Sequence, residues 1–222
     1  MELTGAEIIC ECLLEQGVDT VFGYPGGAAL NTYDALYKYS DRINHILTAH
    51  EQGASHAADG YARSTGKTGV VITTSGPGAT NIVTGLATAN IDSIPVVAIT
   101  ANVTTDQLGR DSFQEVNIVE IVKPITKGSF LVEDVKDLAP TLRKAFELAN
   151  EGRKGAVLVD IPKNITSDKA EFKPLEPKKP EIFEIKNPEN IRVVQDMIKN
   201  AKRPMIYAGG GILSANSSDE FR

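Results

Sequence analysis

The chain is poor in several residue types: of its 222 residues none is tryptophan, two are cysteine and three are methionine. On a helix Cys10 and Cys12 would face different sides and could not pair with each other. This argues against a disulfide-stapled secreted domain and favours reduced, buried thiols in a cytoplasmic protein. No apolar run approaches the roughly 20 residues of a membrane span, and the N-terminus lacks a signal-peptide pattern. We expect neither a membrane partner nor export.

A basic face is also missing. The chain has 23 Lys and Arg against 29 Asp and Glu, a net charge of −6 that is spread along the sequence. Nucleic-acid binding would need a clustered positive surface, so we expect no such partner. Hydrophobic residues amount to 41%, which is enough for a sizeable core.

Apolar segments typical of strands alternate with segments typical of helices. The expected strands are 18–23, 43–49, 69–74, 95–100, 126–132 and 155–161, and the expected helices are 4–16, 28–39, 53–64, 79–90 and 135–150. Thr4 and Glu7 form a capping-box pattern at the start of the first helix. Because several strands are continuously apolar, the pattern predicts an α/β fold with a doubly wound, mostly parallel sheet covered on both faces.

The composition changes after this alternating region. We expect a first domain at 1–165, a linker rich in Pro, Lys and Glu at 166–190, and the truncated start of a second α/β domain at 191–222. In that last part a helix is predicted at 191–201 and a strand at 204–208, followed by Gly209–Gly211.

Several common motifs fail. Gly66–Thr68 resembles the end of a phosphate loop, but the glycine required five positions earlier is Tyr61. The three histidines lack His-Glu-x-x-His spacing, and there is no cysteine pair suited to zinc. The triple glycine at 209–211 is only part of a dinucleotide fingerprint. We therefore predict no metal site in this chain.

Four polar groups are expected at one edge of the sheet. Tyr24, Glu51, Ser75 and Asn102 each follow or end a predicted strand, and ligands of such sheets bind beyond the carboxyl ends of the strands. Glu51 also precedes a helix rich in small residues, near the positive end of its dipole. Its alternative role is that of a simple helix-capping glutamate.

Longer sequence motifs around these residues indicate what the edge could bind. They are the segments 24–28 (YPGGA), 50–54 (HEQGA), 57–63 (AADGYAR) and 74–81 (TSGPGATN). Their order and spacing resemble the pyrimidine-binding domain of thiamine-diphosphate enzymes. The segments 111–115 (DSFQE), 125–127 (ITK), 130–132 (FLV), 152–155 (GRKG) and 159–163 (VDIPK) resemble, within that superfamily, the large subunit of acetolactate (acetohydroxyacid) synthases. The resemblance covers essentially the whole chain.

By that resemblance Glu51 is the catalytic residue, because it matches the glutamate that hydrogen-bonds the aminopyrimidine ring of the cofactor. Sharing a proton with the ring favours an imino tautomer, whose nitrogen can take the proton from the thiazolium carbon. We expect such a carboxyl group to be shielded from water.

The resemblance also implies roles for other residues. Cofactor contacts are implied for Tyr24, Pro25, Gly26, Glu51, Pro77 and Asn81, and a flavin contact for Arg153. Substrate access is implied for Gly27, Ala28, Phe113, Gln114 and Lys127. The alternatives are tight turns for the glycine-containing segments, core packing for Phe113 and a solvated loop charge for Arg153.

The activity implied is decarboxylation of pyruvate on thiamine diphosphate and condensation of the hydroxyethyl carbanion with a second 2-oxoacid, in branched-chain amino-acid biosynthesis. The full-length enzyme would use Mg²⁺ and FAD, form a homodimer or tetramer through its pyrimidine and diphosphate domains, and bind a possible small regulatory subunit. The metal-diphosphate domain is missing, so we expect this chain alone to be inactive. The alternatives are another thiamine-diphosphate-dependent 2-oxoacid decarboxylase or carboligase, or a non-catalytic paralogue. Asn102 and Gly128 depart from the Gln and His usual in the family.

Overall fold

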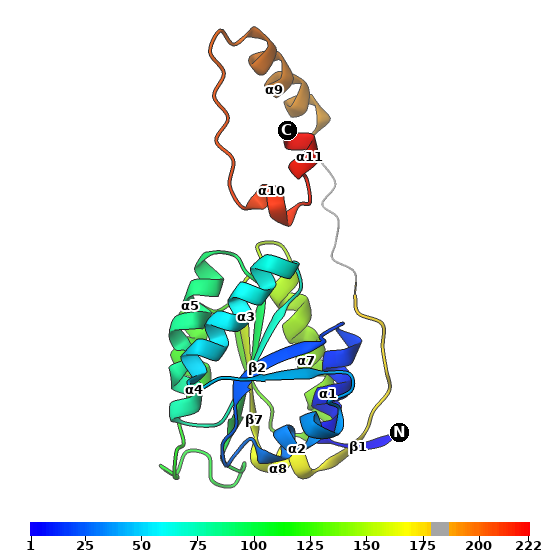
Figure 1. The fold of residues 1–222 in the computed structure, drawn as a ribbon, viewed down its shortest axis with the longest axis vertical. Coiled ribbons are helices and arrows are strands. Elements are labelled where there is room, and N and C mark those ends of the chain that lie inside the picture. The colour runs from blue at the N-terminus through cyan, green and yellow to red at the C-terminus, as the bar shows by residue number, and fades with distance from the viewer. Residues whose placement is uncertain (179–186) are drawn as a thin grey trace. The chain divides into compact units, whose positions relative to one another are not determined.

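A computed structural model describes residues 1–178 and 187–222 of the chain. It divides into two compact units, Met1–Pro180 and Glu181–Arg222, which are described separately below. The first unit is built around a six-stranded sheet with helices on both faces (Figure 1).

The six strands of the central sheet all run parallel to their neighbours. They are β2 (Thr20–Tyr24), β3 (Asn44–Leu47), β4 (Gly69–Thr73), β5 (Val96–Asn102), β6 (Gly128–Leu131) and β7 (Ala156–Pro162). Their spatial order is β3-β2-β4-β5-β7-β6. The predicted fold class is thereby confirmed, and all six carboxyl ends meet at one edge of the sheet.

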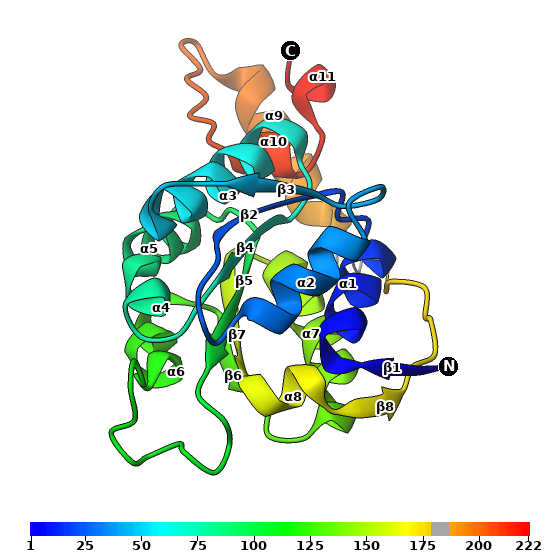
Figure 2. The ribbon, with the colours of Figure 1, turned by 60° about the horizontal axis from the view of Figure 1, so that its bottom comes forward.

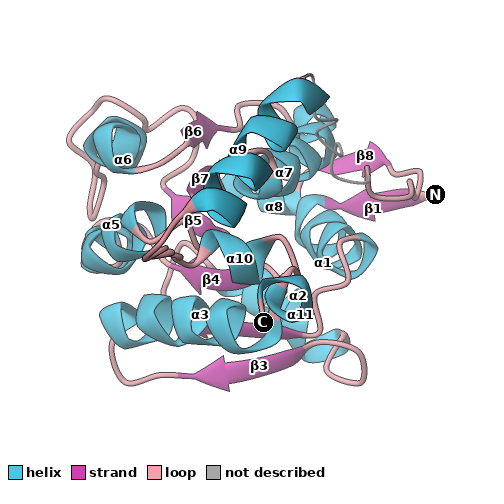
Figure 3. Cartoon of the chain, turned by 90° about the horizontal axis from the view of Figure 1, so that it is seen from above, coloured by secondary structure: helices cyan, strands magenta, loops and turns pink. Residues whose placement is uncertain are grey.

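Two hydrophobic cores lie on the two faces of this sheet, and Figures 2 and 3 show the helices that cover each face. One face is covered by α1 (Gly5–Glu15), α2 (Leu30–Lys38), α7 (Val135–Asn150) and α8 (Lys163–Ser167). The other face is covered by α3 (Glu51–Thr65), α4 (Pro77–Asn81), α5 (Val83–Ile91) and α6 (Ile118–Val122). A 3₁₀ turn (Lys123–Ile125) continues α6. Within β4, Val70 and Ile72 enter the first core and Val71 the second. Strands buried on both faces are mostly apolar, which is why the central strands read as nearly continuous hydrophobic runs.

The predicted capping box is present at the start of α1. The Thr4 hydroxyl accepts a hydrogen bond from the Glu7 backbone N–H at 3.3 Å, and the Glu7 carboxylate accepts one from the Thr4 N–H at 2.9 Å. Cys10 and Cys12 on the same helix are buried and unpaired, as expected. Burial raises the pKa of each thiol to about 12, so both stay protonated and unreactive.

Part of the predicted linker belongs to the first unit. A short strand, β8 (Lys169–Glu171), pairs antiparallel with β1 (Glu2–Thr4), and Phe172 beside it is only 2% exposed. The Arg143 guanidinium lies 5.3 Å from the centre of the Phe172 ring. The first unit thus continues beyond the predicted limit at residue 165, because a terminal strand pair and a buried aromatic ring hold the chain against α7. Residues 179–186 of the predicted linker lie outside the described part.

The second unit contains helices α9 (Pro188–Asn200), α10 (Gly211–Ser214) and α11 (Ser218–Phe221). The predicted helix at 191–201 is confirmed, but the predicted strand at 204–208 is wrong. No described strand pairs with that segment, and Met205 and Tyr207 are 92% and 99% exposed. A strand needs a hydrogen-bonded neighbour, which its own sequence cannot supply. None of the helices in the described ranges is long and apolar enough to cross a membrane.

Candidate functional site

Glu51 lies at the edge formed by the carboxyl ends of the strands. It follows β3 and is the first residue of α3, which begins two residues earlier than predicted. His50 caps the helix, because its Nδ1 accepts a hydrogen bond from the Gln52 N–H at 3.1 Å. The half-buried Glu51 carboxylate therefore stands where the unpaired N–H groups of the helix favour negative charge.

Asn81 and Gly78 of α4 hold Glu51 from the opposite side. Asn81 Nδ2 donates a hydrogen bond to Glu51 Oε2 at 2.9 Å. A Cβ atom on Gly78 would lie 3.4 Å from Oε1, in van der Waals contact. Among the described residues no hydrogen bond reaches Oε1. One carboxylate oxygen is thus fixed and the other is available to a ligand.

The side chain of Thr74, which directly follows β4, lies close to the turns that contain Gly26 and Gly78. A Cβ atom on Gly26 would come within 2.5 Å of the Thr74 side chain, and one on Gly78 within 2.7 Å of its Cγ2. Any larger residue at either glycine would displace Thr74. The Thr74 hydroxyl is buried and has no hydrogen-bond partner within the described ranges. The edge therefore combines close-packed backbone, an unpaired hydroxyl and a carboxylate, features that suit a polar ligand held against the main chain.

The other residues predicted around the cofactor line the same edge. Tyr24 ends β2 and is 42% exposed, and Pro77 is the exposed first residue of α4. Pro25 and Gly27 are exposed, and Ala28 is half-buried. Together with Glu51, Thr74 and Asn81 these residues form what we call the rim site. The turns are indeed tight, so the turn interpretation and a binding role are compatible.

Phe113 and Gln114 also lie beside this edge. They belong to the loop 103–117 that follows β5. The main-chain carbonyl of Gln114 is 2.5 Å from where a Cβ atom on Gly76 would stand, so the loop rests directly on the turn after β4. Phe113 is 86% exposed. Core packing, the alternative interpretation of Phe113, is therefore wrong.

Lys127 lies at the opposite edge of the sheet from Glu51. It precedes β6, and its backbone N–H bonds the carbonyl of Ala156 at the start of β7 at 2.8 Å. Its Nζ donates to the Glu151 carbonyl at 2.5 Å. Burial lowers the pKa of the Lys127 ammonium, which the nearby Glu151 partly offsets. Within one copy of the chain, Lys127 is thus not brought together with the rim site.

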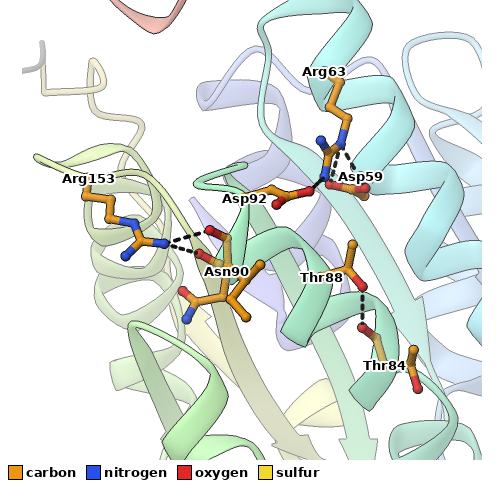
Figure 4. Close-up of polar contacts among 8 residues, drawn as sticks. Asp59, Arg63, Thr84, Thr88, Asn90, Asp92 and Arg153 are labelled. Atoms are coloured by element: carbon orange, nitrogen blue, oxygen red, sulfur yellow. Dashed lines mark hydrogen bonds and ion pairs between the residues drawn. The ribbon is translucent and has the colours of Figure 1, made fainter. Parts of the chain in front are cut away.

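Arg153 is at that opposite edge too, where it caps the C-terminus of α5 (Figure 4). Its Nη2 donates to the carbonyls of Ile91 at 2.7 Å and Asn90 at 3.3 Å, and its Nε to Ser93 Oγ at 2.8 Å. A cation suits the last carbonyls of a helix. Arg153 is thus not a free solvated charge but a support for the turn after α5.

We expect Arg153→Ala to lower the free energy of unfolding of the first unit by about 1 kcal/mol, because the cap is lost at an exposed position. Urea unfolding followed by circular dichroism measures this. Lys154→Ala is the matched control, since Lys154 makes no such bonds in the described structure and its loss should change little. Equal stability of the Arg153 variant and the parent would contradict the capping role.

Sequence analysis missed a buried polar cluster behind the rim site. Asp160 on β7 is 1% exposed and accepts hydrogen bonds from Thr100 Oγ1 and Asn102 Nδ2, both at 2.6 Å. Burial raises the pKa of Asp160 to about 7, although both hydrogen bonds act to lower it. The sequence signal for this cluster was an acidic residue inside an otherwise apolar strand. The register of β5 and β7 then places Asp160 opposite Thr100. Asn102, predicted at the ligand edge, faces this cluster.

Known acetolactate synthases are similar to this chain over nearly its whole length. The chain is 49% identical to the acetolactate synthase large subunit of Buchnera aphidicola subsp. Schizaphis graminum, over 99% of the chain and 39% of that protein. It is 47% identical to the acetolactate synthase of Arthrospira platensis and 44% identical to the large subunit of Haemophilus influenzae, with the same shares covered. The chain spans about two fifths of the length of these curated relatives.

A family profile described as thiamine pyrophosphate enzyme, N-terminal TPP binding domain, matches residues 3–121. The match runs from β1 to the end of α6 and includes the turns and the glutamate of the rim site. It covers more than half of the chain, and the parallel sheet has the expected class of fold. The chain therefore belongs to the thiamine pyrophosphate enzymes and carries their N-terminal TPP-binding domain.

Proposed function

We propose that the chain forms part of an acetolactate synthase, which decarboxylates pyruvate and joins the resulting two-carbon unit to a second 2-oxoacid. The observation that carries the proposal is the geometry of Glu51, whose Oε2 is held by Asn81 while Oε1 has no partner in the described structure. The relatives that carry the acetolactate synthase name match over nearly the whole chain.

The residues of the rim site fit the pyrimidine ring of thiamine diphosphate. An aminopyrimidine offers both donors and acceptors, and the buried Thr74 hydroxyl without a partner can give or take one hydrogen bond. Gly26 and Gly78 leave no side chain between the ring and the main chain. Tyr24, Pro25 and Pro77 add an exposed, partly apolar border. These features support the cofactor contacts that the family resemblance implies.

In this proposal Glu51 is the catalytic residue. When bound, thiamine diphosphate supplies the carbanion chemistry that decarboxylation of a 2-oxoacid requires. Glu51 Oε1 would hold or release a proton at a ring nitrogen, while Asn81 prevents the carboxylate from turning away.

The remaining cofactors and partners belong to a longer chain in this proposal. Mg²⁺ and the diphosphate would be held by a second domain of that longer chain, as the family resemblance implies. The exposed rim site would face that domain in a partner subunit of a homodimer or tetramer. FAD and a small regulatory subunit are further proposals, the latter because two of the relatives above are named large subunits.

The test is acetolactate formation from pyruvate by a chain of the relatives' full length that contains residues 1–222. We expect product only when thiamine diphosphate and Mg²⁺ are both supplied, and more product with FAD present. Release of acetaldehyde from pyruvate without acetolactate would instead indicate a simple decarboxylase. No turnover with any 2-oxoacid would refute the proposal.

For residues 1–222 by themselves we expect weak binding of thiamine diphosphate, with a dissociation constant on the order of 1 mM, because the rim site offers only a few hydrogen bonds of about 1 kcal/mol each. Calorimetric titration measures this. Thiamine without its diphosphate is the matched control and should bind almost equally. Tight binding that needs both Mg²⁺ and the diphosphate would show that the rim site is not the main anchor in this chain.

A further inference from the structure

The loop 103–117 has a backbone that its own sequence does not favour. It contains neither strand nor helix, and three of its residues have positive φ: Gly109 (75°), Asp111 (52°) and Gln114 (57°). Glycine adopts such angles freely, but Asp and Gln do so at a cost. Contacts within the loop must therefore hold this shape.

Glu115 supplies those contacts from inside the loop. Its Oε2 accepts a hydrogen bond from the Ser112 N–H at 2.9 Å, and its Oε1 accepts one from the Gly109 N–H. These bonds, the one from Ser112 first, lower the pKa of Glu115, which is therefore ionised at neutral pH. The Glu115 N–H in turn donates to the Ser112 carbonyl at 3.0 Å. One side chain thus closes the turn that contains both strained residues.

The base of the loop is fixed separately. Asn102 Oδ1 accepts a hydrogen bond from the Val103 N–H at 2.8 Å, while its Nδ2 is tied to the buried Asp160. Asn164 of α8 bonds both the N–H and the hydroxyl of Thr105, at 2.9 and 3.1 Å. Because residues 102–105 are anchored to β7 and α8, a change at Glu115 should affect the tip of the loop without releasing its first residues.

Phe113 stands at that tip, between Ser112, whose backbone N–H bonds the Glu115 carboxylate, and Gln114, which contacts the turn after β4. Its ring is 86% exposed, so packing contributes little to its position. The neighbouring Gln114 carbonyl rests against Gly76, next to the segment that holds Glu51 in place. The position of Phe113 relative to the rim site therefore depends on the backbone of the loop, which is held by the bonds of Glu115 and by the contact of Gln114 with Gly76.

We propose that Glu115 is a positioning residue, which orders the loop so that Phe113 and Gln114 form a preset wall at the mouth of the rim site. The inference rests on the proposed function, in which that mouth admits a 2-oxoacid. Glu115 itself touches no substrate, since its carboxylate is occupied by Gly109 and Ser112. Its effect is on how well the substrate is held and not on the chemical step.

The first test is hydrogen exchange on the Glu115→Gln variant of the 222-residue chain. Glutamine keeps the length of the side chain but loses the charge and one acceptor, so the Gly109 and Ser112 amides should exchange roughly tenfold faster. The melting temperature should change little, because the loop is exposed and its base is intact. The matched control is Glu120→Gln, at an exposed glutamate on α6 whose carboxylate, within the described residues, pairs only with Lys123. Unchanged exchange at Gly109 and Ser112 would overturn the proposal.

The second test separates this role from the proposed function. In an active full-length chain, Glu115→Gln should raise KM for pyruvate about threefold to tenfold and leave kcat within about twofold, as expected when an interaction positions the substrate before the chemical step. Faster exchange with an unchanged KM, or an equal loss confined to kcat, would overturn the positioning role. A parent chain without any activity would refute the proposed function, and the exchange data would then alone decide whether Glu115 orders the loop.

Discussion

Replacing Glu51 with glutamine is expected to lower turnover by at least about a hundredfold, the usual size of a lost proton-transfer step. Glutamine has nearly the same shape, and its carbonyl oxygen can still accept the hydrogen bond from Asn81. It cannot take up or release a proton at the position of Oε1. The measurement is acetolactate formation from pyruvate by a chain of the relatives' full length, with circular dichroism to verify the fold.

The same substitution at Glu7 is the matched control. Glu7 is also a glutamate in the first turn of a helix, and its carboxylate completes the capping box of α1. Glutamine can replace it there as an acceptor, so Glu7→Gln should retain nearly full turnover. If Glu51→Gln is folded and nearly as active as the parent, Glu51 is only a helix-capping residue and the catalytic assignment is wrong.

The architecture of the first unit was predictable because β4, β5 and β7 in the middle of the sheet are buried on both faces. These strands therefore appear as mostly apolar runs, and the first helix has a clear start signal in Thr4 and Glu7. A parallel order then brings the ends of β2 and β4 together with Glu51. The grouping of these positions at one edge needed only the alternation of strands and helices.

Other features of the structure depend on contacts between segments far apart in the chain, which no local sequence pattern encodes. The pairing of β1 with β8 joins the two ends of the first unit, and the exposed segment 204–208 has no described partner strand. The burial of the unpaired Thr74 hydroxyl and the close approach of Gly26 and Gly78 to this side chain also involve separate turns of the chain. The location of Lys127, in contrast, could have been predicted from the sequence. A residue just before a parallel strand must lie at the amino edge, opposite a residue that follows one.

The stability of the first unit is expected to fall as the pH rises from about 4 to 8, because of Asp160. This carboxyl group has an ordinary pKa of 3.8, which burial raises to about 7 in the folded chain. The folded state thus holds the proton more tightly than the unfolded state. Protonated Asp160 therefore makes its full contribution to the stability of the fold below about pH 4, and this contribution is lost as the pH rises through 7. The difference between the two pKa values corresponds to a free energy of unfolding on the order of 4 kcal/mol, of which roughly 2–3 kcal/mol is lost between pH 5 and 8.

Asp160→Asn should remove this loss and leave the variant more stable than the parent at pH 8. Asparagine stays neutral, its carbonyl can accept the bond from Asn102, and its amide can donate to the Thr100 hydroxyl, which is free to rotate. Urea unfolding followed by circular dichroism at several pH values measures the difference. Asp34→Asn is the control, because the Asp34 side chain is 67% exposed and its only ion pair in the described part of the chain is with Lys38. The stability of this variant should follow that of the parent. A fall between pH 5 and 8 as large in Asp160→Asn as in the parent would mean that Asp160 is already ionised in the folded chain, and that its hydrogen bonds with Thr100 and Asn102 outweigh burial.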